Sequence, residues 1–284
     1  MVCNIFLTKK CSGRAKAPLI LALYFKRKLQ MSIFTKAKTL SAVALKPSII
    51  IGQSKYLFIL SHMRSRSSLL SHILGSNDCV CGYSELHRFY LRYRDIIKMR
   101  LELYDDLKCD LRGKYLLDKL LHNKRDISKE VLEAVNPKFI FLLREPESTI
   151  KSTMQMGHIT GNDSYKNPEK VSEYYCSRLS RLKEFAETIG GDYFFLESDD
   201  LVNNTEYILG ELTGWLGLDT PLVENYLMFN NTGKPGYGDP SDNIRAGKII
   251  KTKGHSDIEI PQEILQISEY YYEKCRASLM SHVA

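Results

Sequence analysis

Arginine and serine residues gather directly after an apolar run in the first third of the chain. Tyr56–Leu60 is continuously apolar, and Arg64-Ser-Arg-Ser-Ser68 follows it closely. An apolar run without alternation predicts a strand covered on both faces, and residues 67–74 then show helical spacing up to Gly75. The first N–H groups of a helix are unpaired and carry partial positive charge. With serine hydroxyls and guanidinium groups added, this turn is expected to bind an anion such as phosphate. A serine-rich helix start with solvated arginines is the alternative.

A second segment has the same plan about eighty residues further along the chain. Lys138-Phe-Ile-Phe-Leu-Leu143 predicts another buried strand, and Arg144-Glu-Pro146 follows it. Proline is tolerated in the first turn of a helix, so a helix is expected from Pro146 to Met156. Ser152 would lie about two turns into this helix. Arg144 and Ser152 could then reach one phosphate, although a surface arginine and a mid-helix serine would give the same pattern.

Strand and helix patterns alternate along the rest of the sequence. Further strands are expected at 115–117 and 193–196, and helices at 86–112, 169–189, 204–216 and 262–279. All-apolar strands that alternate with helices predict an α/β fold with three layers, α/β/α, around a central parallel sheet. Residues 230–257 hold five glycines and two prolines. This stretch is too long for a plain connector and predicts a functional loop.

The charge of the chain is unevenly distributed. The net charge is +7, yet the first acidic residue is Asp78, and residues 1–77 contain 13 lysines and arginines. We therefore expect a basic N-terminal extension over 1–54 and one large domain over 55–284. Such an extension can be a targeting segment, a contact with an anionic surface, or a poorly ordered tail. Met31 could also start a shorter chain that keeps the first motif.

Composition bounds the class of protein. A hydrophobic content of 44% and a charged content of 26% are ordinary for a soluble domain with a sizeable core. No apolar run reaches the roughly 18 residues of a membrane span, so a cytoplasmic location is expected. Cys79-x-Cys81 has no second pair at zinc-site spacing among the seven cysteines. No metal is expected, and the thiols should be reduced in a cytosol-like compartment.

Together the two anion-binding segments resemble those of sulfotransferases that use 3′-phosphoadenosine 5′-phosphosulfate (PAPS). In that family, a strand–loop–helix of the type Arg/Lys-Ser-Gly-Ser/Thr-Ser/Thr holds the 5′-phosphosulfate. A second element, Arg-x-Pro with a serine eight residues after the arginine, holds the 3′-phosphate. The segments that begin at Arg64 and Arg144 are similar to these elements. The resemblance implies a P-loop NTPase-like sulfotransferase fold, with PAPS as the sulfonate donor.

The resemblance also implies which residues contact the nucleotide. The contacts with the 5′ side would come from Arg64, Ser65, Arg66, Ser67, Ser68 and Leu69. Those with the 3′-phosphate would come from Arg144 and Ser152, while Lys253 and Gly254 loosely match a loop that closes over the nucleotide. Arg66 departs from the family, which usually has glycine there. Glycine can adopt a positive φ, so an arginine is expected to take another conformation or to add an ion pair of its own.

The implied catalytic residues follow from the reaction. The segment Gly82-Tyr-Ser-Glu85-Leu-His87 is similar to the stretch that presents the catalytic glutamate in carbohydrate-type members, and Lys119 matches a second catalytic lysine. By analogy with phosphoryl transfer, positioning and electrostatic stabilisation should dominate. Arg64 and Lys119 would hold the leaving group, and Glu85 would take the proton of the acceptor hydroxyl, with His87 as the competing base.

Less specific interpretations of Glu85 and Lys119 stay open. Glu85 could instead form a surface salt bridge with Arg88 or Arg92. Lys119 could be a solvated lysine at the end of a strand.

Two other functions compete with sulfonate transfer. A kinase for a small metabolite would use a similar fold, but residues 62–74 contain neither glycine nor lysine and so lack a Walker A loop. A nonenzymatic module that binds polyanions could use the basic N-terminal part. We expect a carbohydrate or other small hydroxyl compound as acceptor and no nucleic acid as partner, and the oligomeric state is open.

Overall fold

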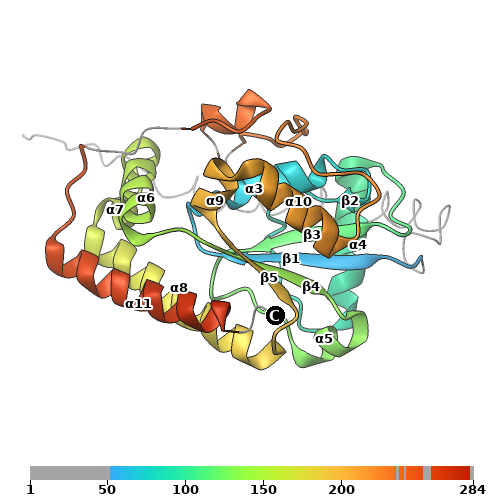
Figure 1. Cartoon of the computed structure of the whole chain (residues 1–284), viewed down its shortest axis with the longest axis horizontal. Coiled ribbons are helices and arrows are strands. Elements are labelled where there is room, and N and C mark those ends of the chain that lie inside the picture. Colours follow the sequence, from blue (N-terminus) through green and yellow to red (C-terminus); the bar gives the residue numbers. More distant parts are fainter. Residues whose placement is uncertain (1–51, 235–236, 240, 252–256, 282–284) are drawn as a thin grey trace, which may run out of the picture. The chain divides into compact units, whose positions relative to one another are not determined.

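A computed structural model describes residues 52–234, 237–239, 241–251 and 257–281. At its centre lies a five-stranded sheet in which each neighbouring pair of strands is parallel (Figure 1). In the order of the sheet, the strands are β2 (Val80–Cys81), β3 (Tyr115–Leu120), β1 (Lys55–Ser61), β4 (Lys138–Leu143) and β5 (Tyr193–Glu197). The predicted α/β class and the parallel sheet are therefore confirmed.

Helices follow the strands along the chain. They are α3 (Ser67–Gly75), α4 (Tyr93–Leu107), α5 (Lys129–Val135), α6 (Pro146–Thr160), α7 (Asp163–Lys166), α8 (Pro168–Ile189), α9 (Ser198–Asn203), α10 (Thr205–Leu216) and α11 (Gln262–Met280), with a short 3-10 helix, η1 (Asp242–Ala246). Several begin at residues whose side chains accept a hydrogen bond from the first turn, including Ser128, Glu145 and Asn167. None of the helices in the described ranges is long and apolar enough to cross a membrane.

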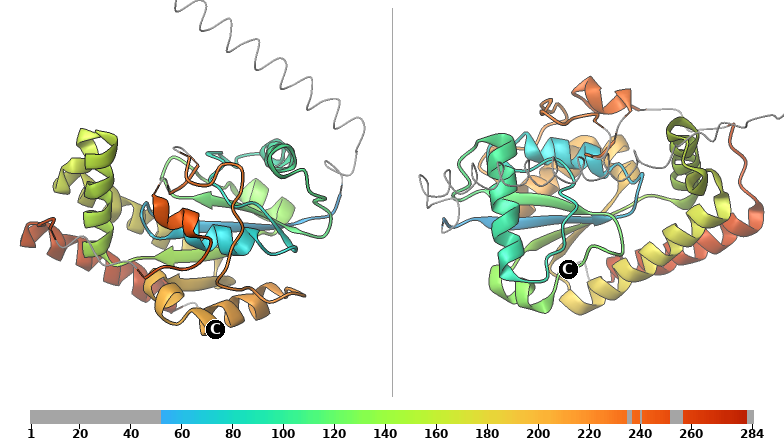
Figure 2. Two further views of the ribbon diagram at one scale, coloured as in Figure 1. Left: turned by 90° about the horizontal axis from the view of Figure 1, so that it is seen from above. Right: turned by 180° about the vertical axis from the view of Figure 1, so that it is seen from behind.

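Alternating residues of β1 pack into two separate hydrophobic clusters. Leu57 and Ile59 face α3, α9 and α10, whereas Phe58 and Leu60 face α4, α5, α8 and α11. The figures show this division: α3, α9 and α10 lie on one side of the sheet, and α8 and α11 run along each other on the opposite side (Figure 1, Figure 2). A strand buried on both faces needs apolar side chains at every position, which explains the unbroken run in the sequence.

The topology brings the two predicted anion-binding turns together. β1 pairs with β4 in parallel, with Ser61 beside Leu142, so both strands end at the same edge of the sheet. In the sheet, β2 and β3 lie on one side of β1, whereas β4 and β5 lie on its other side. In such open α/β sheets, ligands bind outside the carboxyl ends of the strands where the order reverses.

The structure also differs from the expected elements in places. The helix expected over 86–112 runs only from Tyr93 to Leu107, and the residues that precede it form an irregular segment. There the backbone N–H of Tyr90 donates to Asp126 O, and that of Ser128 donates to Tyr90 O. These long-range bonds replace helical ones. Nearly all of the expected N-terminal extension, as well as Lys253 and Gly254, lies outside the described residues.

Candidate functional site

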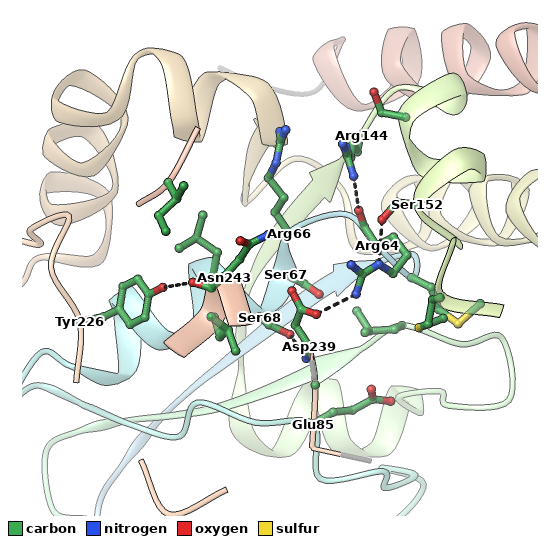
Figure 3. A pocket seen from close by; sticks show the side chains of 18 of the residues that line it. Arg64, Arg66, Ser67, Ser68, Glu85, Arg144, Ser152, Tyr226, Asp239 and Asn243 are labelled. Atoms are coloured by element: carbon green, nitrogen blue, oxygen red, sulfur yellow. Dashed lines mark hydrogen bonds and ion pairs between the residues drawn. The ribbon is translucent and has the colours of Figure 1, made fainter. Parts of the chain in front are cut away.

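A cavity of about 510 Å³ opens at the carboxyl edge of the sheet. Its wall is built by the turn after β1, the start of α6, the segment around Glu85, and part of the predicted functional loop (Figure 3). Its lining includes the predicted residues Arg64, Arg66, Ser67, Ser68, Leu69, Glu85, His87, Arg144 and Ser152. Together with Leu121 and His122, residues from five distant parts of the sequence thus share one site.

The turn after β1 has an unusual backbone. Arg64 has φ of 61° and Arg66 has φ of 65°, both in the left-handed region that non-glycine residues seldom adopt. The Oγ of Ser61 donates to the Oγ of Ser65 at 2.6 Å, and both side chains are fully buried. The Ser65 hydroxyl therefore braces the turn from behind and does not line the cavity.

The structure shows how Arg66 is accommodated where the sulfotransferases that this chain resembles usually have glycine. It takes the left-handed conformation that a glycine would take, as the residue that caps the start of α3. Its guanidinium forms an ion pair with Asp199 and donates to the carbonyl of Ser198 at 3.0 Å. Contacts at the start of α9 hold the arginine in this conformation. Of the two expected outcomes, the ion pair is therefore the one observed.

Arg64 links the two predicted segments directly. Its Nε donates to the Oγ of Ser152 on α6 at 2.9 Å, and its Nη1 lies 3.0 Å from the Oδ1 of Asp239 (Figure 3). The Nη1 of Arg144 donates to the carbonyl oxygen of Arg64 at 3.1 Å. The side chains of Arg64, Ser152 and Arg144 therefore lie together on one wall of the cavity.

Arg144 is held with part of its donor capacity unused. Its backbone N–H donates to the Nε2 of His62, and its carbonyl accepts from the hydroxyl of Tyr175. Burial, together with the nearby positive charge of Arg66, lowers the pKa of Arg144 to about 10. Its buried Nε has no hydrogen-bond partner within the described part of the chain. An unpaired buried donor costs free energy, so a bound anion beside Arg144 would be favourable.

Lys119 lies at the floor of the site, behind Ser68. The sheet positions it, since it pairs with Ile59 in the register between β3 and β1. The lysine is fully buried, and its Nζ donates to the Oγ of Ser68 at 3.1 Å. Burial lowers the pKa of Lys119 to about 8, although the negative charges of Glu85 and Asp118 oppose the shift. The interpretation of Lys119 as a solvated strand-end lysine is therefore wrong.

Gly238 allows the functional loop to approach this floor. The backbone N–H of Asp239 donates to the Oγ of Ser68 at 3.0 Å. A Cβ at Gly238 would lie 2.8 Å from the same oxygen and 3.2 Å from the Nζ of Lys119, and its φ is 129°. Only glycine fits this position without strain.

Glu85 is a buried carboxylate at the opposite end of the cavity. Its Oε1 lies 3.1 Å from the Nδ1 of His87 and 3.5 Å from the Nε of Arg125, while its side chain is 5% exposed. Burial would raise the pKa of Glu85, but its hydrogen bond with His87 and the charge of Lys119 outweigh that effect and lower it. The expected alternative of a surface pair with Arg88 is not observed, since Arg88 pairs with Glu102.

His87 is a partner of Glu85. Its φ of 56° places its backbone in the left-handed region. The segment is fixed from below by Asp118, which accepts hydrogen bonds from the backbone of Leu86 at 2.8 Å and from the hydroxyl of Tyr90 at 2.6 Å. Burial raises the pKa of Asp118 to about 6.

The sequence did not single out several residues of the site. Asp239 is the most important of them, and His122, Tyr226, Asn243 and Lys248 also line the cavity. The glycines and prolines of residues 230–257 indicated a functional loop but gave no sign of which side chains enter the site. Within the described residues, no group of three or more histidines, cysteines or carboxylates is arranged to hold a metal ion.

The strand ends behind the cavity are joined by a buried arginine. Arg178 on α8 is 3% exposed and donates to the carbonyl oxygens of Ser61 at 2.9 Å and of Leu120 at 2.6 Å. These carbonyls lie at the carboxyl ends of β1 and β3. Arg178 therefore fixes the strands that carry the turn of Arg64 and the side chain of Lys119.

Comparisons with known proteins identify the fold. No protein-family model matches the sequence, and no curated protein matches it. Among solved structures, the sulfotransferase domain from the curacin biosynthetic pathway has a TM-score of 0.56 and 18% identity, covering 79% of this chain and 98% of that domain. The sulfotransferase domain of an olefin synthase from Synechococcus has a TM-score of 0.54 and 18% identity, covering 78% of this chain and 96% of that domain. The resemblance inferred from the two anion-binding segments is thus confirmed at the level of the fold: the described domain has the sulfotransferase fold.

Proposed function

We propose that this protein is a sulfotransferase that moves a sulfonate group from PAPS to a hydroxyl of a small molecule or carbohydrate. One observation carries the proposal. Two arginine–serine anion sites, contributed by neighbouring parallel strands, line a single cavity that also contains the buried carboxylate of Glu85. A nucleotide with phosphates at both its 5′ and 3′ positions needs two such sites. Sulfonate transfer to a hydroxyl also needs a base.

The two anion sites would divide the donor between them. Arg64, Ser67 and Ser68, with the first N–H groups of α3, would hold the 5′-phosphosulfate. Arg144 and Ser152 would hold the 3′-phosphate, for which the buried and unpaired Nε of Arg144 is the best support. The donor supplies an activated sulfonate, and the chain supplies positive charge around it. Glycine at position 238 leaves room beside Ser68 for the functional loop to cover this region.

Glu85 is suited to accept the proton of the attacking hydroxyl. Its pKa is lowered by His87 and Lys119 despite burial, so the carboxylate is ionised at neutral pH. As the new oxygen–sulfur bond forms, the hydroxyl proton would pass to Glu85 while the bond between sulfur and the phosphate oxygen breaks. The Nδ1 of His87 lies 3.1 Å from the Oε1 of Glu85, and the His87 side chain is 42% exposed. It would orient the carboxylate and pass the proton to solvent.

Lys119 and Arg64 would stabilise the charge that develops on the leaving phosphate. A buried ammonium acts in a medium of low dielectric constant, where its field is stronger than in water. Lys119 is fully buried and aimed at Ser68. The cavity volume of about 510 Å³ is within the range of small-molecule sites.

Calorimetric titration with adenosine 3′,5′-bisphosphate, AMP and Mg²⁺-ATP tests the proposal. We expect the bisphosphate to bind much more tightly than AMP, because AMP has no 3′-phosphate to pair with the Nε of Arg144. A preference for Mg²⁺-ATP would instead support the kinase. Binding of heparin with steep salt dependence, without selectivity for the bisphosphate, would support the polyanion-binding module.

A further inference from the structure

Two cysteines lie in contact at the edge of the sheet, outside the cavity. Cys81 is the last residue of β2, and Cys109 follows the end of α4, 28 residues further along the chain. Their sulfur atoms are 2.8 Å apart, and both are free thiols. A disulfide bond measures about 2.0 Å, so the two sulfurs need to move together by less than 1 Å to bond. Within the described part of the chain, no other two cysteine sulfurs form such a contact.

The two thiols differ in their access to solvent. Cys81 is 1% exposed, whereas Cys109 is partly exposed at the start of the loop that leads to β3. The hydrogen bond with Cys81, aided by the positive charge of Lys114, lowers the pKa of Cys109 below that of an ordinary thiol. The thiolate is the reactive form of cysteine. Cys109 is therefore the thiol that a dissolved oxidant meets first, and Cys81 is the buried partner behind it.

The surrounding structure indicates which segment a bond between Cys81 and Cys109 would hold in place. β2 is a two-residue edge strand whose ladder contacts are with Tyr115 and Leu116. Immediately after Cys81, Gly82 packs so closely on β3 that a Cβ there would lie 2.2 Å from the carbonyl oxygen of Leu117. From this point the chain runs directly to Glu85. Because β2 is so short, few backbone hydrogen bonds hold the start of the segment that leads to Glu85. A covalent bond there would add much to the stability of that segment.

We propose that Cys81 and Cys109 form a reversible disulfide when the protein meets hydrogen peroxide or a related hydroperoxide. The thiolate of Cys109 attacks one peroxide oxygen, which gives a sulfenic acid and releases hydroxide. The thiol of Cys81 then attacks the sulfenic sulfur, so that the disulfide forms and water leaves. Overall, two thiols lose two electrons and two protons, and one peroxide becomes two waters. A dithiol reductant reverses the bond by exchange.

The disulfide should stabilise the domain. It would close a loop that contains α4 and tie β2 to the segment after that helix, which lowers the entropy of the unfolded chain. We expect the melting temperature of the oxidised protein to rise by roughly 5 °C or more. Cys79 offers a matched control, because it is a free and partly exposed thiol two residues from Cys81, whereas the hydrogen bond of Cys109 is with Cys81.

Peptide mapping of the full-length protein tests the site. The reduced protein is treated with one equivalent of hydrogen peroxide, blocked with N-ethylmaleimide under denaturing conditions, and digested without reductant. We expect a cross-linked peptide pair that joins Cys81 to Cys109 and disappears after treatment with dithiothreitol. Cys79→Ser should keep both this product and the rise in melting temperature, whereas Cys109→Ser should lose both.

Three results would overturn the proposal. One is a sulfenic or sulfinic acid on Cys109 with Cys81 still free for alkylation. Another is a disulfide between Cys79 and Cys81 in the wild-type protein. The third is an unchanged melting temperature in a sample whose cross-link is complete. Mapping of the wild-type protein decides the first two even if Cys109→Ser fails to fold, and none of these readouts depends on sulfotransferase activity.

Discussion

The carboxylate of Asp239 forms an ion pair with the guanidinium of Arg64 inside the cavity, with Nη1 and Oδ1 3.0 Å apart. The two residues are 175 positions apart in the sequence. The positive charge of Arg64 and its hydrogen bond with Asp239 lower the pKa of Asp239 despite burial, so it is ionised at neutral pH. The cavity proposed to bind phosphates thus contains a negative charge of its own, next to the arginine that should face the donor.

Asp239→Asn should strengthen the binding of adenosine 3′,5′-bisphosphate. Removing a negative charge from a partly buried anion site relieves repulsion worth on the order of 1 kcal/mol, so we expect a gain of roughly fivefold. Calorimetry measures it, with Asp242→Asn as the control, because Asp242 is exposed on the same loop. Weaker binding by Asp239→Asn than by wild type would show that the carboxylate serves to orient Arg64.

Arg144→Ala should weaken the binding of adenosine 3′,5′-bisphosphate far more than the binding of AMP. A charge-assisted hydrogen bond is worth about 1.5–3 kcal/mol, so a loss of roughly 10- to 100-fold is expected for the ligand that carries the 3′-phosphate. Affinity for AMP should hardly change. Arg112→Ala removes an exposed arginine paired with Asp110 and serves as the control for charge. Equal losses for both ligands would refute the assignment of the 3′-phosphate to Arg144.

Glu85→Gln should abolish turnover while nucleotide affinity stays nearly intact. The amide keeps the shape of the side chain but cannot accept the proton, and general-base catalysis contributes roughly 100-fold or more. The assay follows formation of adenosine 3′,5′-bisphosphate with a panel of hydroxyl acceptors. His87→Ala should have a smaller effect, because His87 acts through Glu85. If the order of the two effects is reversed, His87 is the base.

The activity should fall as the pH rises above about 8. Lys119 has a pKa of about 8 in the folded protein because it is buried, and only its protonated form can stabilise the leaving phosphate. Raising the pH through this value removes the charge, whereas at lower pH the charge is fully present. Lys119→Arg should shift the alkaline fall upward, since arginine stays protonated. A pH–rate profile of both proteins tests this, and an unchanged alkaline limb in an active Lys119→Arg would exclude Lys119 as its cause.

The sequence was sufficient to predict the central strands of the fold and the location of the candidate site. Unbroken apolar runs identified β1 and β4 because both faces of each strand are covered. Once these strands are neighbours in a parallel sheet, the turns that begin at Arg64 and Arg144 must lie together. Local pattern and a simple rule of topology were enough for that step.

Other features depend on contacts between distant parts of the chain. The left-handed conformation of Arg66 is held by residues at the start of α9, 132 and 133 positions away. Asp239 enters the cavity from a loop without periodicity, and Tyr90 binds Asp118 where a helix was expected. Such contacts leave no repeating trace in the local sequence, so no pattern could reveal them.

The pairing of β1 with β4 has a consequence for how this site can change during evolution. Neighbouring strands are held roughly 4.8 Å apart by main-chain hydrogen bonds, whatever their side chains. The sheet therefore sets the separation of the turns that begin at Arg64 and Arg144, and Arg178 holds the ends of β1 and β3 behind it. In the proposed sulfotransferase, substitutions in the surrounding loops would alter which acceptor enters without changing the distance between the two groups that hold the nucleotide.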